Sequence, residues 1–128
     1  VTGRPRDCGW FDAVAMRHVC ALNGVDGIAL RKIDVLEGAG PLRICVAYEV
    51  DGRRIDEFPA DVDLLPRARP VYREMPGFAE PLKSVRRPED LPRRVSAYVQ
   101  AVAKESGARI LLLSVGPDRE ETFAMETR

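Results

Sequence analysis

Apolar residues recur at helical spacing in two stretches of the chain. In residues 9–23 they lie three or four positions apart, which predicts a helix buried on most sides. This first stripe consists of Trp10, Phe11, Val14, Ala15, Val19 and Leu22. Asn23-Gly24 then supplies a left-handed helix end. A second helix is predicted over residues 91–106, ending at Gly107, from Val95, Tyr98, Val99, Val102 and Ala103.

Strand patterns alternate with these helices. Residues 27–35 and 42–50 predict two strands, and Asp51-Gly52 is typical of a two-residue hairpin that returns residues 53–55 antiparallel. The continuous apolar run over 109–115 suits a central strand of a mostly parallel sheet, and residues 122–125 predict a last short strand. The alternation of helices and strands indicates an α/β fold.

The segment over residues 59–92 differs in composition from the rest of the chain, because it holds seven of the ten prolines. Long regular elements do not survive that density of proline. We expect a folded, loop-rich excursion with a short helix near residues 61–68 and an extended piece over 70–75.

Composition narrows the class of protein. The chain has 128 residues, 45% of them hydrophobic, and its 20 Lys and Arg balance its 20 Asp and Glu. One domain with a real core is expected at this length, and zero net charge argues against a general nucleic-acid binder. No apolar run approaches the roughly 20 residues of a membrane span.

The cysteines indicate a reducing compartment. There are three of them, Cys8, Cys20 and Cys45, widely spaced and without a C-x-x-C motif, so neither a disulfide framework nor a zinc site is predicted. We therefore expect a cytoplasmic protein. The chain begins Val1-Thr2-Gly3-Arg4 without Met or a signal peptide, and we expect it to be a piece of something longer.

A first candidate binding site is the segment Val1-Thr2-Gly3-Arg4-Pro5-Arg6. Arg4 and Arg6 lie on a Gly/Pro-shaped loop just before the first predicted helix. Guanidinium groups bind carboxylates and phosphates as planar forks, and a helix N-terminus favours anions. The segment fits an anionic substrate, although a solvated loop with surface arginines is the common alternative.

A second candidate is Arg31-Lys32-Ile33-Asp34, at the carboxyl end of a predicted strand. An Asp there can accept hydrogen bonds from both N1–H and the N2 amino group of guanine, a donor pair that adenine does not offer. The stem of Lys32 could lie over the base. The K-x-D pattern is short and common, and in isolation a charge pair at a strand edge is its more usual explanation.

A third candidate is Ser114-Val115-Gly116-Pro117-Asp118-Arg119, after the most apolar strand. Gly116 would let a ligand approach the backbone closely, and backbone N–H groups could bond a base oxygen. A plain strand-exit turn is the alternative. His18 fits a core or helix-surface position, and the sequence holds no nucleophile motif, metal-ligand cluster, phosphate loop or G-x-G-x-x-G.

The order of these signals is more specific than any one of them. Thr2-Gly-Arg-Pro-Arg, Cys8-Gly-Trp-Phe-Asp, Lys32-Ile-Asp-Val-Leu, Ile44-Cys-Val-Ala-Tyr and Ser114-Val-Gly-Pro-Asp-Arg-Glu together resemble the adenylosuccinate synthetase family. The likeness runs from Val1 to about Thr122 and corresponds to the carboxyl-terminal third of that enzyme. It implies a fold related to P-loop NTPases, with a mostly parallel sheet flanked by helices, and makes residues 1–128 a carboxyl-terminal fragment of one catalytic domain.

The resemblance implies a ligase of AMP biosynthesis that joins inosine monophosphate (IMP) to L-aspartate. GTP phosphorylates the 6-oxygen of the base, and the aspartate amine then displaces that phosphate. The family works as a homodimer with Mg²⁺. Its glycine-rich phosphate loop, catalytic Asp and His, and metal ligands would lie outside this chain, so the resemblance implies no catalytic residue and no metal ligand here. The chain alone is expected to be inactive.

The resemblance also implies residue roles. Val1, Thr2, Gly3, Arg4, Pro5 and Arg6 match the end of the loop that closes over L-aspartate. Within it, Arg4 would contact aspartate and IMP, and Arg6 would contact aspartate and the GTP side. Two stretches would bind GTP through its guanine: Lys32, Ile33 and Asp34, and Ser114, Val115 and Gly116.

Two positions depart from the family pattern. Asp7 stands where a basic residue is usual, which lowers the local positive potential, and Arg31 stands where Thr is common. Two other hypotheses stay open at this stage. The chain could be a stand-alone guanine-nucleotide binding module, or a subunit-interaction piece that needs its other half to fold.

Overall fold

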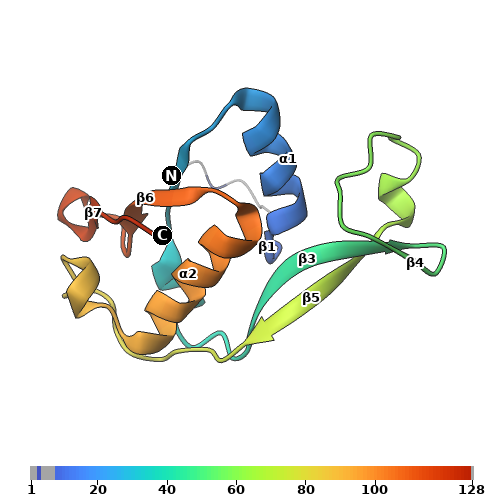
Figure 1. Cartoon of the computed structure of the whole chain (residues 1–128). Coiled ribbons are helices and arrows are strands. Elements are labelled where there is room, and N and C mark those ends of the chain that lie inside the picture. The colour runs from blue at the N-terminus through green and yellow to red at the C-terminus, as the bar shows by residue number, and fades with distance from the viewer. Residues whose placement is uncertain (1–2, 4–7, 128) are drawn as a thin grey trace.

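The computed structural model describes residue 3 and residues 8–127. These form two α-helices and seven strands, drawn in Figure 1. The helices are α1 (Ala13–Asn23) and α2 (Arg93–Ser106). The strands are β1 (Phe11–Asp12), β2 (Gly27–Leu30), β3 (Leu42–Val50), β4 (Arg53–Ile55), β5 (Arg69–Met75), β6 (Arg109–Ser114) and β7 (Thr122–Ala124). Short 3₁₀ helices cover Ile33–Leu36, Leu65–Arg67, Pro88–Asp90 and Arg119–Glu121.

The described strands form two separate sheets. In one, β3 pairs with β1 in parallel and with β4 and β5 antiparallel; in the other, β6 pairs with β2 in parallel and with β7 antiparallel. The mixture of helices and strands confirms the α/β prediction. A single, mostly parallel sheet is wrong for this chain, because tight returns such as Asp51-Gly52 bring neighbouring strands back antiparallel.

The first helix begins four residues later than predicted. Asp12 caps it, since its Oδ1 accepts a hydrogen bond from the Ala15 N–H at 3.0 Å, and β1 precedes it. Gly24, at φ 61°, ends the helix in the predicted left-handed conformation. Burial on most sides is wrong: Val19 is 49% exposed and Leu22 is 71% exposed.

The strand predictions succeed where the local signal is strong. β3 has the predicted bounds, β4 follows the hairpin, and β6 and β7 end one residue early. The strand predicted over 27–35 stops at Leu30, because the backbone turns sharply at Lys32. The short helix expected near 61–68 is only the 3₁₀ turn at Leu65–Arg67, and the extended piece expected over 70–75 is β5.

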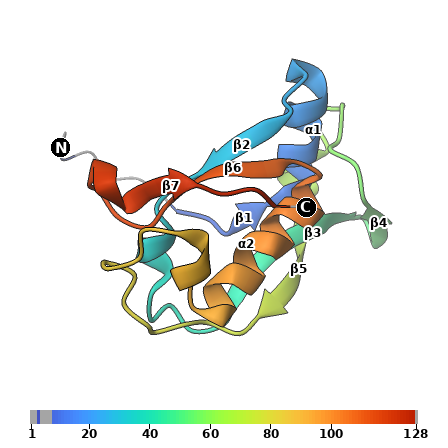
Figure 2. The ribbon, with the colours of Figure 1, turned by 60° about the vertical axis from the view of Figure 1, so that its left-hand side comes forward.

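Helix α2 lies between the two sheets in Figures 1 and 2 and carries the largest share of the core. Every residue of its predicted stripe is buried. The stripe shares one apolar cluster with residues of β3 and β6. The proline-rich excursion adds Phe78, Leu82 and Val85 to that cluster, all at most 5% exposed. The excursion is therefore part of the fold, as predicted, and its path over the core positions one wall of the candidate site.

An arginine that the sequence patterns left unremarked ties three segments together. The Arg17 guanidinium donates hydrogen bonds to the carbonyl oxygens of Glu105, Val46 at 3.4 Å and Asp56 at 3.0 Å. It thereby links α1 to the end of α2, to β3 and to the segment after β4. The bonds to Glu105 and Val46 are partly buried, where a carbonyl group without a donor would be destabilising.

Candidate functional site

The structure brings together the second and third candidates from the sequence. β2 and β6 are parallel neighbours with Leu30 paired to Leu113, so both chains leave the sheet at the same edge. Asp34, Gly116 and Pro117 line two adjoining cavities of about 320 Å³ and 200 Å³. The carboxyl edge of parallel strands is where α/β folds bind ligands.

A strained backbone at Lys32 positions the residues after β2, which form the first wall of this site. Lys32 has φ 63°, a left-handed conformation that costs a non-glycine residue about 1 kcal/mol or more. The turn there starts the 3₁₀ helix Ile33–Leu36. It sends the Ile33 side chain into the core, where it is 2% exposed, and leaves the next residue, Asp34, at the cavities. Ile33 therefore anchors the wall, and only its backbone could meet a ligand.

The Asp34 carboxylate lacks hydrogen bonds that a buried group requires. Its Oδ1 is buried and accepts no hydrogen bond from any residue that the structure describes. A buried, unsatisfied acceptor costs about 1–3 kcal/mol, so such a group in a cavity wall calls for a donor from elsewhere. A ligand with N–H donors would satisfy it.

The second wall follows β6. Ser114 donates its hydroxyl hydrogen to the Gly116 carbonyl at 2.9 Å, and the Val115 N–H donates to the Glu121 carbonyl at 2.9 Å. The Val115 amide is therefore occupied, and its side chain is only 1% exposed. This hydrogen bond holds the turn in shape, and it leaves the expectation that backbone N–H groups of residues 114–119 bond a base oxygen to amides other than that of Val115.

Gly116 is required for a reason that the sequence did not suggest. A Cβ on Gly116 would lie 2.1 Å from Glu121 Oε2, so the close neighbour is this chain's own carboxylate. Glu121 is 4% exposed and accepts a hydrogen bond from the Asp118 N–H at 3.0 Å, in a reciprocal capping box. The D-x-x-E spacing of residues 118–121 is the sequence pattern that predicts such a capping box.

The excursion supplies wall residues that sequence reasoning missed. Leu82 and Lys83 line the larger cavity, together with Glu37 from the end of the 3₁₀ helix. Leu82 is buried in the core at 1% exposure, which fixes the position of its neighbour Lys83. No local pattern signals this contact, because residues 34 and 82 meet only through the fold.

The first candidate lies almost wholly outside the described residues. This applies to Val1, Thr2, Arg4, Pro5 and Arg6, and to the departure at Asp7. Gly3, which is described, is exposed and has φ 59°.

A separate polar cluster at the start of α1 is structural. The Tyr48 hydroxyl donates to Asp12 Oδ2 at 2.6 Å, while Asp12 Oδ1 caps the helix. Burial, followed by the nearby Asp12 charge, raises the pKa of the Cys45 thiol to about 11. Burial and the hydrogen bond to Asp12 likewise raise the pKa of Tyr48. These groups stay protonated at neutral pH and hold β3 against α1.

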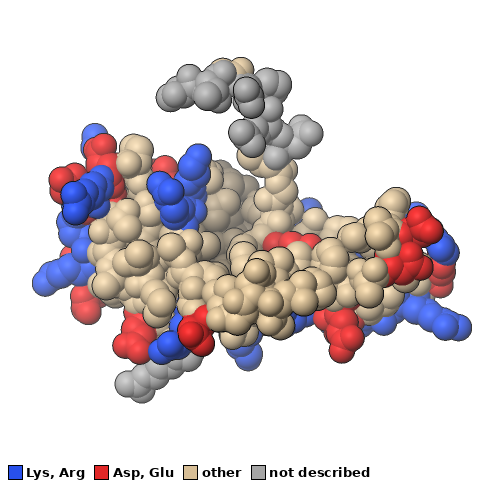
Figure 3. Space-filling view, turned by 90° about the horizontal axis from the view of Figure 1, so that it is seen from above, with Lys and Arg blue, Asp and Glu red and all other residues tan. Residues whose placement is uncertain are grey.

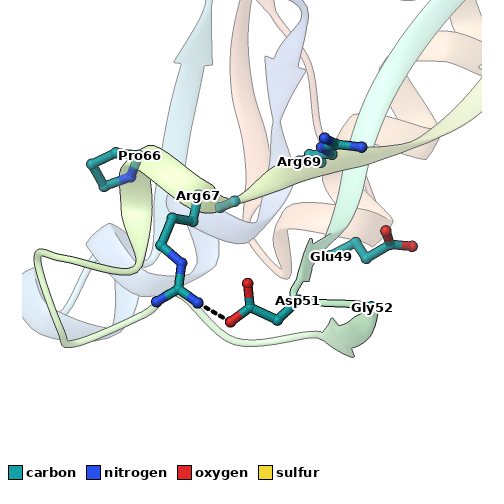
Figure 4. A pocket seen from close by; sticks show the side chains of 7 residues that line it. Glu49, Asp51, Gly52, Pro66, Arg67 and Arg69 are labelled. Carbon is teal, nitrogen blue, oxygen red and sulfur yellow. Dashed lines mark hydrogen bonds and ion pairs between the residues drawn. The ribbon is translucent and has the colours of Figure 1, made fainter.

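Two other features of the described residues lie away from this site. A cavity of about 470 Å³ lies between the hairpin and the 3₁₀ turn, where Arg67 forms an ion pair with Asp51 (Figure 4). His18 is half-buried on α1 and stacks on Phe58 with ring centroids 4.9 Å apart, which fits the predicted core or helix-surface position. Among residues 3 and 8–127, no group of three or more His, Cys, Asp or Glu side chains gathers as metal ligands.

Comparison with known proteins assigns the chain to a family. The profile described as adenylosuccinate synthetase matches residues 1–123. The chain belongs to the adenylosuccinate synthetase family. It is 48% identical over 126 residues to the adenylosuccinate synthetase of Streptococcus gordonii and equally to that of Streptococcus sanguinis, covering 98% of this chain in each case.

A solved structure shows the same fold. The fully ligated adenylosuccinate synthetase of Plasmodium falciparum superposes with a TM-score of 0.89 at 29% identity over 97% of this chain. The chain spans 29% of the length of the two streptococcal relatives and 30% of the solved chain. Within the part of the chain that is described, no helix is long and apolar enough to cross a membrane.

Proposed function

We propose that this chain supplies the guanine pocket and two substrate-binding arginines of an adenylosuccinate synthetase. The parent enzyme would be a ligase that joins IMP to L-aspartate at the expense of GTP. Membership of the family supports the reaction class, and the geometry at the ends of β2 and β6 supports this chain's part in it.

The observation that carries the proposal is the Asp34 carboxylate. Its buried Oδ1 has no donor among the described residues, in a cavity that the β2 and β6 exits share. Guanine presents N1–H and an N2 amino group side by side, and a carboxylate accepts both. Adenine leaves those acceptors unpaired, so this pocket selects GTP over ATP. Lys32 would flank the base, and Ser114, Val115 and Gly116 would form the opposite wall.

The arginine loop is proposed from the sequence alone. Arg4 would contact aspartate and IMP, and Arg6 would contact aspartate and the GTP side. Val1, Thr2, Gly3 and Pro5 would shape the loop around the amino acid. The forked guanidinium group suits the carboxylates and phosphate of these substrates.

The parent's phosphoryl-transfer machinery is proposed to lie outside this chain. Phosphoryl transfer depends on a phosphate cradle and a metal ion, and Mg²⁺ would be held by residues that this chain does not contain. Residues 1–128 would then form one part of a single catalytic domain. The relation to P-loop NTPases, the homodimer and the cytoplasmic location stay predictions.

The position of the chain within its relatives is also a prediction. The matched share, 29%, gives a length and does not confirm the carboxyl-terminal third. Aligning the chain with the whole Streptococcus gordonii protein tests it: a match over the relative's last third supports the placement, and a match that starts near the relative's first residue places the segment at the amino-terminal end instead.

Turnover tests the proposed function. The chain alone should form no adenylosuccinate from IMP, L-aspartate and GTP. A chimera, in which residues from this chain replace the 126 matched residues of the Streptococcus gordonii protein, should form it with GTP and much less with ATP. Turnover by the purified chain alone, or a folded chimera without GTP-dependent ligation, would contradict the proposal.

This chain brings the two proposed guanine-binding stretches together at the cavities that Asp34 and Gly116 line. That favours a second candidate, a guanine-nucleotide binding module without catalysis. Such a module would bind GDP in preference to ADP by itself, whereas a part that lacks its phosphate cradle should bind neither appreciably.

A further inference from the structure

In the described part of the chain, Lys83 is the one cationic residue that lines the larger cavity at the ends of β2 and β6. It comes from the proline-rich excursion. Four carboxylate side chains line the same cavity, those of Asp34, Glu37, Asp118 and Glu121. The Lys83 ammonium group nevertheless forms no ion pair with any residue that the structure describes. The cavity wall therefore holds a donor group without a partner.

The backbone holds Lys83 firmly in this wall. Its neighbour Leu82 is 1% exposed in the core, and the Leu82 carbonyl accepts a hydrogen bond from the Val85 N–H at 3.0 Å. The Arg86 guanidinium donates a hydrogen bond to the carbonyl of Lys83 itself. These contacts fix where the exposed Lys83 side chain starts. Its ammonium group has three N–H donors that can turn toward a ligand.

A second set of contacts fixes the excursion against the first wall of the site. The Gly38 N–H, just beyond that wall, donates a hydrogen bond to the Phe78 carbonyl at 2.8 Å. Beside this bond, a Cβ on Gly77 would collide with the Gly40 carbonyl oxygen, so the two backbones cross in close contact. The carboxylate on one wall and the ammonium group on the other therefore start from backbones that this crossing holds together.

The turn after β6 offers few backbone donors to a ligand. The Val115 N–H is bonded to the Glu121 carbonyl, and the Asp118 N–H is bonded to Glu121 Oε2. Pro117 has no N–H group. A ligand oxygen at the larger cavity therefore gains an important donor in the Lys83 ammonium group.

The unpartnered acceptor and the unpaired donor of this cavity match one edge of guanine. The buried Asp34 Oδ1 accepts no hydrogen bond from the described residues. Guanine presents the donors N1–H and N2 amino group, with the acceptor O6 next to N1–H. We propose that Lys83 is a specificity-determining residue for GTP, whose ammonium group donates a hydrogen bond to O6 while Asp34 accepts from N1–H and the N2 amino group. This inference rests on the proposed function and deepens it.

This pair of residues discriminates twice against adenine. Adenine carries an amino group where guanine carries O6, so its N–H donors would face the donors of Lys83. Asp34 would also lose both of its partners. Charges of both signs gather at the end of the molecule where the excursion and the turn before β7 lie (Figures 1 and 3). Selection therefore comes from these two groups and their geometry, and not from a field of one sign.

Nucleotide analogues that differ at position 6 of the base test the inference in the chimera with the Streptococcus gordonii protein. 6-Thio-GDP keeps N1–H and the N2 amino group but replaces O6 by sulfur, a weak acceptor. Measured by titration calorimetry, Lys83→Met should weaken the binding of GDP by about tenfold or more and that of 6-thio-GDP by less than about threefold. Inosine diphosphate, which keeps O6 and lacks the N2 amino group, should lose as much as GDP. ADP should lose nothing.

Two further variants control for charge and for folding. Lys104→Met is the matched control, because Lys104 is exposed on α2 and lines neither cavity; it should change GDP affinity by less than about twofold. Lys83→Arg keeps a cationic donor and should keep GDP affinity within about threefold of the original. All three variants should unfold within about 3 °C of the unaltered chimera, because both lysines face water.

Equal losses for GDP and 6-thio-GDP in Lys83→Met, or no loss for either, would overturn the inference. Equal losses for GDP and ADP would do so too, because they indicate contact with N7 or the phosphates, which both nucleotides share. Failure of the proposed function gives a different result. A folded, unaltered chimera without a preference for GDP over ADP contradicts the guanine pocket itself, whereas a chimera that has this preference and keeps it in full in Lys83→Met contradicts only the role of Lys83.

Discussion

Changing Asp34 to Asn should separate ligand binding from folding. The Asp34 Oδ1 atom is buried without a hydrogen-bond partner among the described residues, so the empty site gains little from the negative charge. We expect the free energy of unfolding without ligand to change by no more than about 1 kcal/mol. Guanine binding should fall steeply. The two hydrogen bonds from guanine to the charged carboxylate contribute about 1.5–3 kcal/mol each. The Asn side chain keeps one weaker acceptor, its amide oxygen, and its NH₂ group would face a guanine N–H donor.

The expected net loss is therefore about 3–5 kcal/mol, or about 100- to 4,000-fold in the affinity for GDP. Titration calorimetry of the chimera with GDP measures it. Glu37→Gln is the matched control, because Glu37 lines the same cavity and its side chain is exposed; its effect should stay below about threefold. Adenine nucleotides should bind equally before and after the Asp34 change. If Asp34→Asn leaves GDP affinity within threefold of the original, the carboxylate does not read the base.

Three further predictions concern stability and reactivity. In urea melts, Gly116→Ala should lower the free energy of unfolding by about 1–3 kcal/mol, because the new Cβ would lie 2.1 Å from a buried carboxylate oxygen. The control Gly9→Ala, at a position with open space around it, should change the free energy of unfolding little. Equal effects of the two variants would refute the packing argument. Arg17→Ala should lower the free energy of unfolding by about 2–3 kcal/mol, because three carbonyl groups lose their hydrogen-bond donor. A loss under about 0.5 kcal/mol would show that these three hydrogen bonds do not stabilise the fold. Burial raises the pKa of Cys45 from 9.0 to about 11, so the folded state favours the protonated thiol over the thiolate. The stability that the protonated thiol contributes is complete below pH 9 and is lost as the pH rises toward 11. At pH 8.5, mass spectrometry should therefore find the exposed Cys8 alkylated well before Cys45, and equal rates would contradict this burial.

The sequence predicts those elements whose signals are local. The Asp51-Gly52 turn defines the β3–β4 hairpin, and Gly107, at φ 69°, ends α2 where the pattern stops. The buried stripe of α2 follows from its 3.6-residue period, because one face of that helix is enclosed within this chain. The same reasoning fails for α1, whose apolar residues Val19 and Leu22 face outward. Apolar periodicity predicts which face of a helix is apolar. It does not predict whether residues of the same chain cover that face.

The candidate site was predicted in outline. Parallel pairing of β2 with β6 is enough to place Lys32-Ile-Asp34 beside Ser114-Val-Gly116, and the structure does so. The left-handed turn at Lys32 and the approach of Lys83 could not be read from residue patterns. The first is a non-glycine residue held in a disfavoured conformation by its surroundings, and the second joins segments far apart in the chain.

The relative affinity for GDP and ADP tests the central claim most directly, because the claim is that Asp34 and the β6 exit read guanine. Calorimetry of the chimera should show a preference for GDP of about a hundredfold or more, abolished by Asp34→Asn. Equal affinity for the two nucleotides in the folded chimera would contradict the account.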